Sequence, residues 1–192
     1  MNSKLSAAAG KGKLDQVQKL LKTGADPNAP GPQGVPPLYV AALYNHTSVV
    51  QALLAAGADV NHSNHVGYTP LMAASRGGHA AVIKILIEAG ADLKASANRG
   101  MTALVFACQY GSADAVQCLL EHGADISVIA SGSPVICWAV YNPDAAEAIV
   151  RLLLARGADA AQRDGSGRNA RDHAEKRNPA LLPLLQQAQS RP

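Results

Sequence analysis

In the middle of the chain, apolar residues recur at two short runs of helical spacing. Leu71 and Ala74 lie three positions apart, so they share one face of a short helix. The second run consists of Val82, Ile83, Leu86 and Ile87. Gly77 and Gly78 separate the two runs, and glycine destabilises a helix interior. The pattern therefore predicts one helix before the glycine pair and a second helix from His79 onward.

The residues that flank these runs have the chemistry of helix ends. Thr69 is placed to accept hydrogen bonds from the free amides of the first turn, and Pro70 suits the first helical position. Gly90 follows the second run, where a left-handed cap is expected, and Asp92 suits the turn after it. Two helices this short do not bury a core alone, so neighbouring units must stack.

The Gly-Ala-Asp sequence that closes this unit recurs along the chain. It begins at Gly24, Gly57, Gly90, Gly123 and Gly157, at intervals of 33, 33, 33 and 34 residues. Self-similarity at a fixed period of this length indicates one supersecondary unit that is repeated in a stack.

The segment from Gly67 to Asp92, with Thr69-Pro70-Leu71 before its first helical run and Gly78-His79 at its turn, resembles a complete ankyrin repeat. The resemblance extends over about residues 3–188. It implies an all-α repeat solenoid of helix-turn-helix units with hairpin fingers, with about four full repeats between two capping repeats. We expect a single domain, residues 1–192, with repeats at about 3–28, 29–61, 62–94, 95–127, 128–160 and 161–190.

Two repeats depart clearly from the ankyrin pattern. The second has Pro36-Pro37-Leu38-Tyr39 where the family has Thr-Pro-Leu-His, so a side-chain helix cap is lost. In the fifth, ten positions lead from Gly123 to Ser133, whereas twelve lead from Gly57 to Thr69. This spacing predicts a shorter finger in the fifth repeat, and residues 141–144 predict a longer helix turn.

The last expected repeat carries its own irregularities. Arg171 stands where the ankyrin motif has an apolar leucine. The expected buried stripe of its second helix consists of Leu181, Leu182, Leu184 and Leu185. We expect Pro183 to bend that helix and the chain to fray from Gln186 onward.

Composition places the chain among folded proteins, because 48% of its residues are hydrophobic and 16% are charged. The first residues contain no apolar run long enough for a signal peptide, and no stretch approaches a transmembrane span. Three cysteines are an odd and sparse set, which favours a reduced compartment and a cytoplasmic protein. We expect Cys108 and Cys118 to be small core residues.

Charge is unevenly distributed, although the formal net charge is only +3. Residues 1–30 carry five lysines against two acids, and residues 150–192 carry eight basic residues against four acids. Residues 31–149 carry four basic residues against eight acids. Basic ends would attract an acidic partner, but terminal repeats need polar outer faces, and we interpret both ends as solvated caps. Without an aromatic platform, the N-terminal lysines do not indicate a nucleic-acid site.

The sequence contains no nucleophile elbow, phosphate-binding loop, dinucleotide fingerprint or zinc-binding helix. His62 and His65 lie on one expected finger and suggest a metal. Two imidazoles without a carboxylate or thiolate partner are more simply polar finger residues. We therefore predict no catalytic residue, no metal and no cofactor.

The other histidines have either a structural explanation or none. His46 and His79 occupy the Gly-His position of the ankyrin helix turn, where a structural role is expected. The sequence shows no metal-binding or catalytic group of residues around His122 or His173.

The resemblance also implies where a partner docks, because ankyrin proteins usually bind on the concave side, formed by finger tips and the exposed face of each first helix. Counting from the Thr-Pro position gives the corresponding residues here. They are Gln33, Val35, Leu43, Tyr44, His65, Val66, Tyr68, Arg76, Asn98, Arg99, Met101, Gln109, Tyr110, Tyr141 and Asn142. In the closing repeat, Arg168, Lys176 and Arg177 fall on the equivalent side.

Four of the five tyrosines fall on this expected surface, and Tyr44 and Tyr110 occupy the same repeat position. Tyrosine, arginine and methionine are residues that interfaces favour, because each offers contact area with a polar or adaptable tip. The alternative is that tyrosines simply tolerate half-exposed helix positions. Trp138 is expected to pack between repeats, in a direction that the irregular fifth repeat leaves open.

We therefore predict a non-catalytic, monomeric protein–protein interaction module that binds a partner protein through its concave face and binds neither nucleic acid nor membrane. The first alternative is an inhibitor or immunity-type protein, which would have one tight, stoichiometric enzyme partner. Further alternatives are a metal-dependent protein that uses His62 and His65, and a nucleic-acid-binding protein that uses the basic ends.

Overall fold

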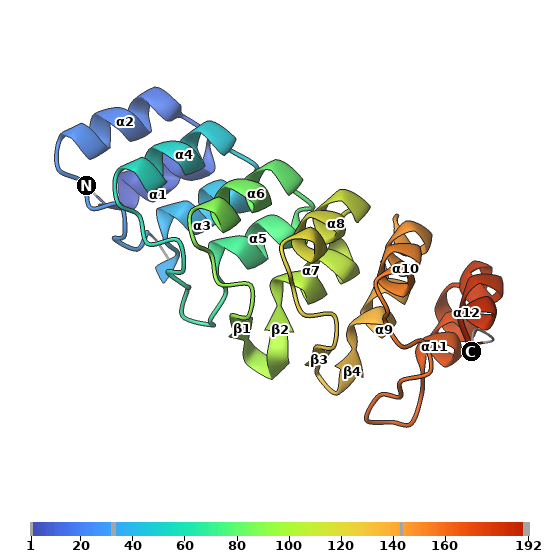
Figure 1. The fold of residues 1–192 in the computed structure, drawn as a ribbon. Helices are drawn as coiled ribbons and strands as arrows, with labels where there is room; N and C mark the ends of the chain where they lie inside the picture. The colour runs from blue at the N-terminus through green and yellow to red at the C-terminus, as the bar shows by residue number, and fades with distance from the viewer. Residues whose placement is uncertain (1, 32–33, 143, 190–192) are drawn as a thin grey trace.

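The computed structural model describes residues 2–31, 34–142 and 144–189. Its α-helices are α1 (Asn2–Gly10), α2 (Leu14–Lys22), α3 (Pro37–Leu43), α4 (Thr47–Ala55), α5 (Pro70–Arg76), α6 (Ala80–Glu88), α7 (Ala103–Tyr110), α8 (Ala113–Glu121), α9 (Val135–Val140), α10 (Ala146–Ala155), α11 (Ala170–Arg177) and α12 (Leu182–Gln189). Within the described residues the helices follow one another in pairs, from α1 and α2 to α11 and α12, and each pair stacks on the next (Figure 1).

Short fingers connect the helix pairs. In two of them the chain forms antiparallel strands, β1 (Ser96–Ala97) with β2 (Met101–Thr102), and β3 (Ile129–Ala130) with β4 (Ser133–Pro134). A 3₁₀ turn, η2 (Asn98–Gly100), joins β1 to β2, and another, η3 (Pro179–Leu181), precedes α12. The fingers project from one edge of the stack (Figure 1). The predicted all-α repeat solenoid with hairpin fingers is thus the architecture of this chain.

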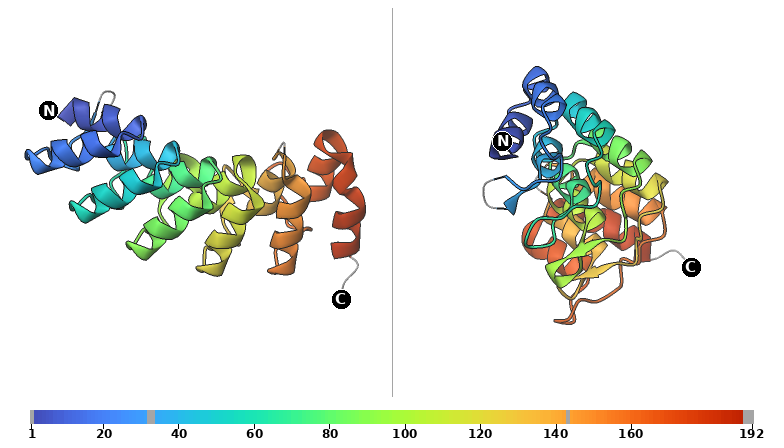
Figure 2. Two further views of the ribbon diagram at one scale, coloured as in Figure 1. Left: turned by 90° about the horizontal axis from the view of Figure 1, so that it is seen from above. Right: turned by 90° about the vertical axis from the view of Figure 1, so that its left-hand side faces the viewer.

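The odd-numbered helices, which we call the first helices, pack against one another more closely than the even-numbered second helices do. Small side chains permit this approach, because the distance between helix axes depends on the side chains at the contact. Ala41, Ala74 and Ala107 are fully buried on α3, α5 and α7. The closer packing gives the stack a concave side on the first helices and a convex side on the second helices, seen from two further directions in Figure 2.

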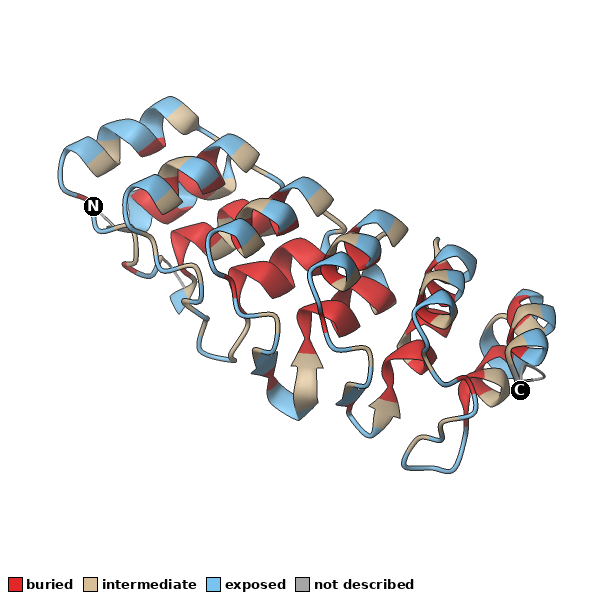
Figure 3. Ribbon diagram, in the orientation of Figure 1, coloured by how far each residue is buried: buried red, intermediate tan, exposed pale blue. Residues whose placement is uncertain are grey.

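The core runs through the whole stack between the two layers of helices (Figure 3). Each second helix from α4 to α10 contributes the same fully buried leucine: Leu53, Leu86, Leu119 and Leu153. Their intervals of 33, 33 and 34 residues repeat those of the Gly-Ala-Asp sequences. Because each repeat presents its apolar stripe to its neighbours, the core is continuous, as solenoid packing requires.

Helix ends agree with the residue chemistry. The Thr69 hydroxyl accepts from the amide of Met72 at 3.3 Å, and Thr102 accepts from Val105 at 3.4 Å. Pro36 caps α3 without any side-chain hydrogen bond, so the predicted loss of a cap in the second repeat is confirmed. The five glycines of the Gly-Ala-Asp sequences have φ between 86° and 90°, the left-handed conformation that glycine adopts most readily.

One side chain just before each second helix from α4 to α8 reaches back to the preceding repeat. Nε2 of His46 lies 3.0 Å from the carbonyl of Gly10, and Nε2 of His79 lies 3.0 Å from the carbonyl of Leu43. The Ser112 hydroxyl donates to a backbone carbonyl of the preceding turn at 3.1 Å. The two histidine contacts satisfy carbonyl groups at the last residues of α1 and α3, and the serine bond satisfies one in the turn after α5. The structural role predicted for the two histidines is therefore correct.

The fifth repeat differs in one detail from its prediction. The sequence spacing places its helix cap at Ser133, but the structure places the cap at Pro134. The chain reverses between β3 and β4 through Ser131 and Gly132, both with positive φ, whereas the three residues of η2 join β1 to β2. The finger is thus shorter, as predicted, by one position rather than two. The longer turn is confirmed, since residues 141–145 separate α9 from α10 and only residues 111–112 separate α7 from α8.

At the C-terminal end, two expectations are wrong. Pro183 does not bend a helix: it is the second residue of α12, where its missing N–H removes no internal hydrogen bond. The chain also remains helical past Gln186, as far as Gln189. Leu181 and Leu185 are buried, whereas Leu182 and Leu184 are half-buried.

The cysteines are thiols in different environments. Cys108 is fully buried, as predicted, and burial raises its pKa well above the usual range. Cys118 is only half-buried, so its assignment to the core is wrong in part, although burial still raises the pKa of its thiol. A raised pKa keeps a thiol protonated and unreactive at neutral pH.

Candidate protein-binding face

The concave side ends at the turns that follow the first helices, and exposed tyrosines stand at three of these turns. Tyr44 follows α3 directly, Tyr110 is the last residue of α7, and Tyr141 follows α9. Their side chains are 58%, 50% and 40% exposed. Burial of an apolar core does not require three large rings to be exposed at the ends of the first helices.

Two arginines lie against two of these rings. The guanidinium carbon of Arg76, at the end of α5, is 5.4 Å from the centre of the Tyr110 ring. That of Arg177, at the end of α11, is 5.7 Å from the centre of the Tyr141 ring. Both distances are typical of cation–π contacts. We call Arg76, Tyr110, Tyr141 and Arg177 the arginine–tyrosine row; its members come from four successive helix pairs.

A chain of hydrogen bonds orients Tyr141. Its hydroxyl lies 2.8 Å from Nδ1 of His173, and Nε2 of His173 lies 2.8 Å from Oδ2 of Asp164. The side chains of His173 and Asp164 are only 6% and 5% exposed. A carboxylate accepts, so Nε2 of the imidazole donates to Asp164, and Nδ1 forms the second hydrogen bond of the ring with the Tyr141 hydroxyl. The exposed ring of Tyr141 is thus held in place from beneath.

Asp164 is held in its ionised form by donors around its carboxylate. The hydroxyl of Ser166, 2.6 Å from Oδ1, is the main group that lowers the pKa of Asp164. The amides of Arg168 and Ser166 and the ring of His173 lower the pKa further, against the burial that raises it. Arg168 also lies 3.7 Å from Oδ2. These bonds link the last finger to α11 and to Tyr141.

Asn142 does not lie on the binding surface, so its assignment as a contact residue is wrong. Its side chain is 3% exposed and donates to the carbonyls of Cys108 at 3.2 Å and Gly111 at 3.1 Å. Its Oδ1 accepts from the amides of Asp144 and Ala145. Asn142 therefore fixes the turn that carries Tyr141 against the turn after α7.

The remaining expected contact residues divide by exposure. Tyr44, His65, Val66, Arg76, Asn98, Arg99, Tyr110 and Tyr141 are exposed, whereas Val35, Leu43, Tyr68, Met101 and Gln109 are half-buried. Tyr68 packs edge-on against Phe106, with ring centres 5.3 Å apart, so much of its ring serves the core. Gln33 lies outside the described residues.

The sequence analysis did not predict two features of this region. Ile129 on β3 is 50% exposed at a finger. The apolar run of residues 128–130 gave no signal in the sequence, whereas in the structure Ile129 faces outward and Ala130 inward, because successive strand residues face opposite sides. The His173 hydrogen bonds were also missed, since their partners lie nine and 32 residues away in the chain.

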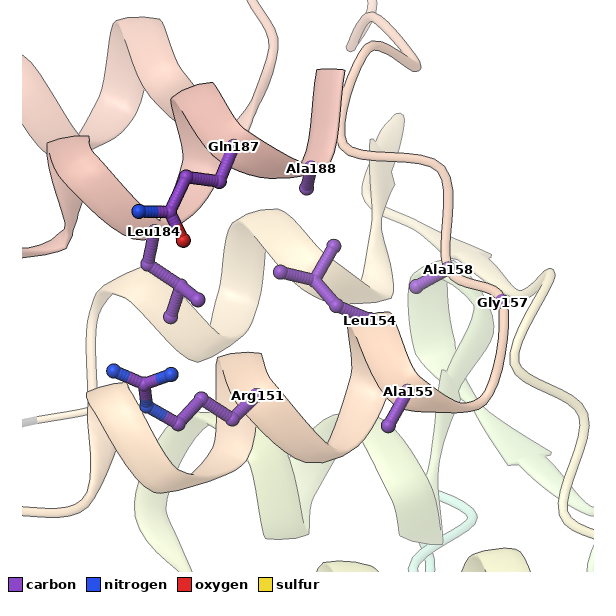
Figure 4. Close-up of a pocket in the computed structure, with 8 residues that line it drawn as sticks. All are labelled: Arg151, Leu154, Ala155, Gly157, Ala158, Leu184, Gln187 and Ala188. Carbon is purple, nitrogen blue, oxygen red and sulfur yellow. The ribbon is translucent and has the colours of Figure 1, made fainter. Parts of the chain in front are cut away.

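Other parts of the molecule offer weaker sites. A pocket of about 580 Å³ lies between α10 and α12 on the convex side (Figure 4). It is lined by Arg151, Leu154, Ala155, Gly157, Ala158, Leu184, Gln187 and Ala188. Arg151 already pairs with Glu147 on its own helix at 2.8 Å, and both side chains are mostly exposed. The pocket is therefore a solvated gap between two second helices, with no unpaired charge to select a ligand.

Two further findings concern metal binding and membrane insertion. Within residues 2–31, 34–142 and 144–189, no group of three or more His, Cys, Asp or Glu side chains is arranged to hold a metal ion. His62 and His65 thus have no third ligand of these types within this part of the chain. None of the helices described here is long and apolar enough to cross a membrane.

Comparison with known families agrees with the repeat architecture. The family model described as ankyrin repeats in three copies matches residues 5–97 and 93–164. These segments cover well over half of the chain, so the protein belongs to the ankyrin repeat family. Ankyrin repeats are generally protein–protein interaction modules without catalytic activity. No curated protein matches the chain.

Proposed function

We propose that this protein is a non-catalytic adaptor that binds a partner protein through the concave ends of its first helices and the adjoining finger tips. The observation that carries the proposal is the arginine–tyrosine row, in which two arginines and two exposed rings from four helix pairs lie on one surface. Tyrosine and arginine are the side chains most often found at energetic centres of interfaces. Tyr44 and the exposed finger residues Val66, Arg99 and Ile129 would enlarge the contact.

Pre-organisation supports this assignment. A side chain that is already fixed loses less conformational entropy when a partner binds, so more of the contact energy appears as affinity. Tyr141 is fixed by His173, and its turn is fixed by Asn142. Nothing in the core requires the Tyr141 ring to remain 40% exposed while its hydroxyl is anchored.

Location and oligomeric state belong to the same proposal. We place the protein in the cytoplasm as a monomer, because Cys108 and Cys137 are buried thiols rather than disulfides. Both ends of the stack carry charged helices, which suits a capped solenoid without self-association.

Affinity capture from the native host tests the proposal. The bait proteins are the wild type, a Tyr44→Ala/Tyr110→Ala variant and a control with Gln51→Ala/Gln117→Ala on the convex second helices. All four residues are exposed, so circular dichroism should show three folded baits. We expect one or more proteins to be captured by the wild type and the control, and lost from the tyrosine variant. Equal capture by all three baits would contradict concave-face binding.

The mass of the captured complex separates an adaptor from the inhibitor or immunity-type alternative. An inhibitor should form a 1:1 complex with a single enzyme and abolish its activity. An adaptor should leave the partner's own activity in place. Purified complex, measured by light scattering and by the partner's assay, distinguishes these outcomes.

A further inference from the structure

We infer that the arginine–tyrosine row recognises an acidic, extended segment of a partner protein. This inference rests on the proposed function and specifies the chemistry of the partner.

The finger and first-helix segments contain no acidic residue over four successive repeats. Residues 27–46, 60–79, 93–112 and 126–143 include Arg76, Lys94 and Arg99 but neither aspartate nor glutamate. The acids of this region lie in the second helices, in the Gly-Ala-Asp turns, or just before α10. Asp144, the nearest of them to Tyr141 in sequence, lines a shallow depression with Glu147 and Arg151 of α10. From α3 to α9 the concave side therefore attracts carboxylates, whereas the convex side carries both signs of charge.

The two arginines of the row have no acidic partner within the part of the chain that the structure describes. Among the described residues, no carboxylate lies within ion-pair distance of Arg76 or Arg177. The acids of α11 are already engaged: Asp172 accepts from the amide of Asn169 at 2.9 Å, and Glu175 pairs with Arg171 at 3.3 Å.

Each arginine is also positioned before a partner arrives. Contact of the guanidinium with a tyrosine face, at 5.4 Å for Arg76 and 5.7 Å for Arg177, leaves the N–H groups at the edge of the guanidinium available. These groups form a planar fork that matches a carboxylate in a bidentate contact.

The order of the row defines the segment that it fits. Two tyrosine rings from neighbouring repeats lie between the arginines. The middle of the partner segment would therefore place uncharged side chains on the rings, and each end of the segment would place a carboxylate beside an arginine. An extended chain fits this span with fewer residues than a helix, because it advances about 3.3 Å per residue and a helix only about 1.5 Å. Single-stranded nucleic acid fits less well, since it needs a continuous series of phosphate contacts and this face has few cations.

A selection from a library of random 16-residue peptides tests the inference. The wild type alone is the target of the selection, and an Arg76→Gln/Arg177→Gln variant, the row variant, is compared with it afterwards. A Lys22→Gln/Arg156→Gln variant loses the same charge from exposed convex positions and serves as the matched control. Selected peptides are synthesised with a fluorescent label, and each is compared with a copy in which every Asp and Glu becomes Asn and Gln. A 16-nucleotide oligo-dT provides the nucleic-acid arm.

We expect the selected peptides to be acidic and to bind the row variant about tenfold or more weakly than the wild type, because two charge-assisted contacts are lost. The convex control should bind within about twofold of the wild type. Neutralised copies should also bind about tenfold or more weakly, and added salt should weaken the acidic peptides.

Four results would overturn the inference. Neutral peptides that bind through Tyr44 and Tyr110 would refute the acidic partner while leaving concave-face binding intact. Peptides that bind the row variant and the Tyr44→Ala/Tyr110→Ala variant as tightly as they bind the wild type would count against both the acidic partner and concave-face binding. A selection that enriches no sequence would also count against both. Oligo-dT that binds more tightly than any acidic peptide, and is lost from the row variant, would replace a protein partner with nucleic acid.

Discussion

Single side chains with more than one partner hold the irregular C-terminal part of this solenoid. Asp164, His173 and Asn142 each join segments that are not adjacent in the chain. All three side chains are buried, and a buried polar group that loses its partner is more destabilising than a net hydrogen bond is stabilising. Their contributions can be measured one residue at a time.

Asp164→Asn should lower stability at neutral pH by about 1–3 kcal/mol, the range for hydrogen bonds to charged groups. The pKa of Asp164 is lower in the folded protein than the value of about 3.9 expected for an unfolded chain. Its stabilising effect is therefore present above pH 4 and is lost as the pH falls through the lower, folded-state pKa. Urea unfolding of both proteins should show a difference that shrinks between pH 5 and pH 2. Asp144→Asn, at an exposed carboxylate, is the control. A difference that stays constant with pH would contradict the assigned charge state.

Asn142→Ala should destabilise the protein by about 2 kcal/mol or more. The change leaves the carbonyls of Cys108 and Gly111 and two amides of the turn without their partner. Fluorescence of Trp138, the single tryptophan, should detect the loss, because its indole N–H donates to the carbonyl of Ala130 in the same repeat. Gln117→Ala, which removes an exposed amide, should change stability by less than about 0.5 kcal/mol. A similarly small effect of Asn142→Ala would show that the turn is held by other contacts.

Residue roles were predictable where they depend on local sequence. The cap at Thr69 and the left-handed glycines follow from neighbours within four positions, and both are present. Asn142 and His173 were not predictable, because each role depends on groups 31 to 34 residues away along the chain. An asparagine in a turn has the same local signature whether it faces solvent or the preceding repeat.

At the scale of elements, each helix is short and depends on its ends. The first helices have between six and nine residues, a length at which an isolated helix is marginal in water. Two of them receive a threonine cap, whereas α3 and α9 begin at prolines without one. The spacing of apolar residues predicted these helices well. It misplaced the fifth cap by one residue, because the cap is Pro134, the last residue of β4, as Thr102 is the last residue of β2.

Thr69→Ala should lower the free energy of unfolding by about 1 kcal/mol, the usual effect of losing a side-chain cap. The hydroxyl of Thr69 accepts from the amide of Met72 at a buried helix start, so no solvent replaces it. Thr23→Ala removes an exposed hydroxyl that donates to the Leu20 carbonyl, and it should have a smaller effect. Thermal unfolding followed by circular dichroism compares the two. Equal effects would indicate that α5 is held by packing alone.

At the scale of the whole molecule, the repeat period and the solenoid were predictable because identical units must stack in the same way. The binding surface was predictable only in part. Equivalent repeat positions identified Tyr44 and Tyr110, and the helix turn of the fifth repeat identified Tyr141, but the pairing of Arg76 with Tyr110 depends on side-chain direction across a repeat boundary. The absence of acidic residues from α3 to α9 and their fingers can be read from the sequence, but only after the segments are assigned to the first helices and fingers.

The central claim is that a protein partner covers the concave ends of the first helices. Hydrogen exchange of backbone amides, measured by mass spectrometry with and without the partner recovered by capture, tests it most directly. We predict slower exchange in the turns at residues 109–112 and 141–145 and in the finger at residues 96–102, with second helices α4, α6 and α8 unchanged. Protection confined to those second helices, with no change at the turns, would contradict the account.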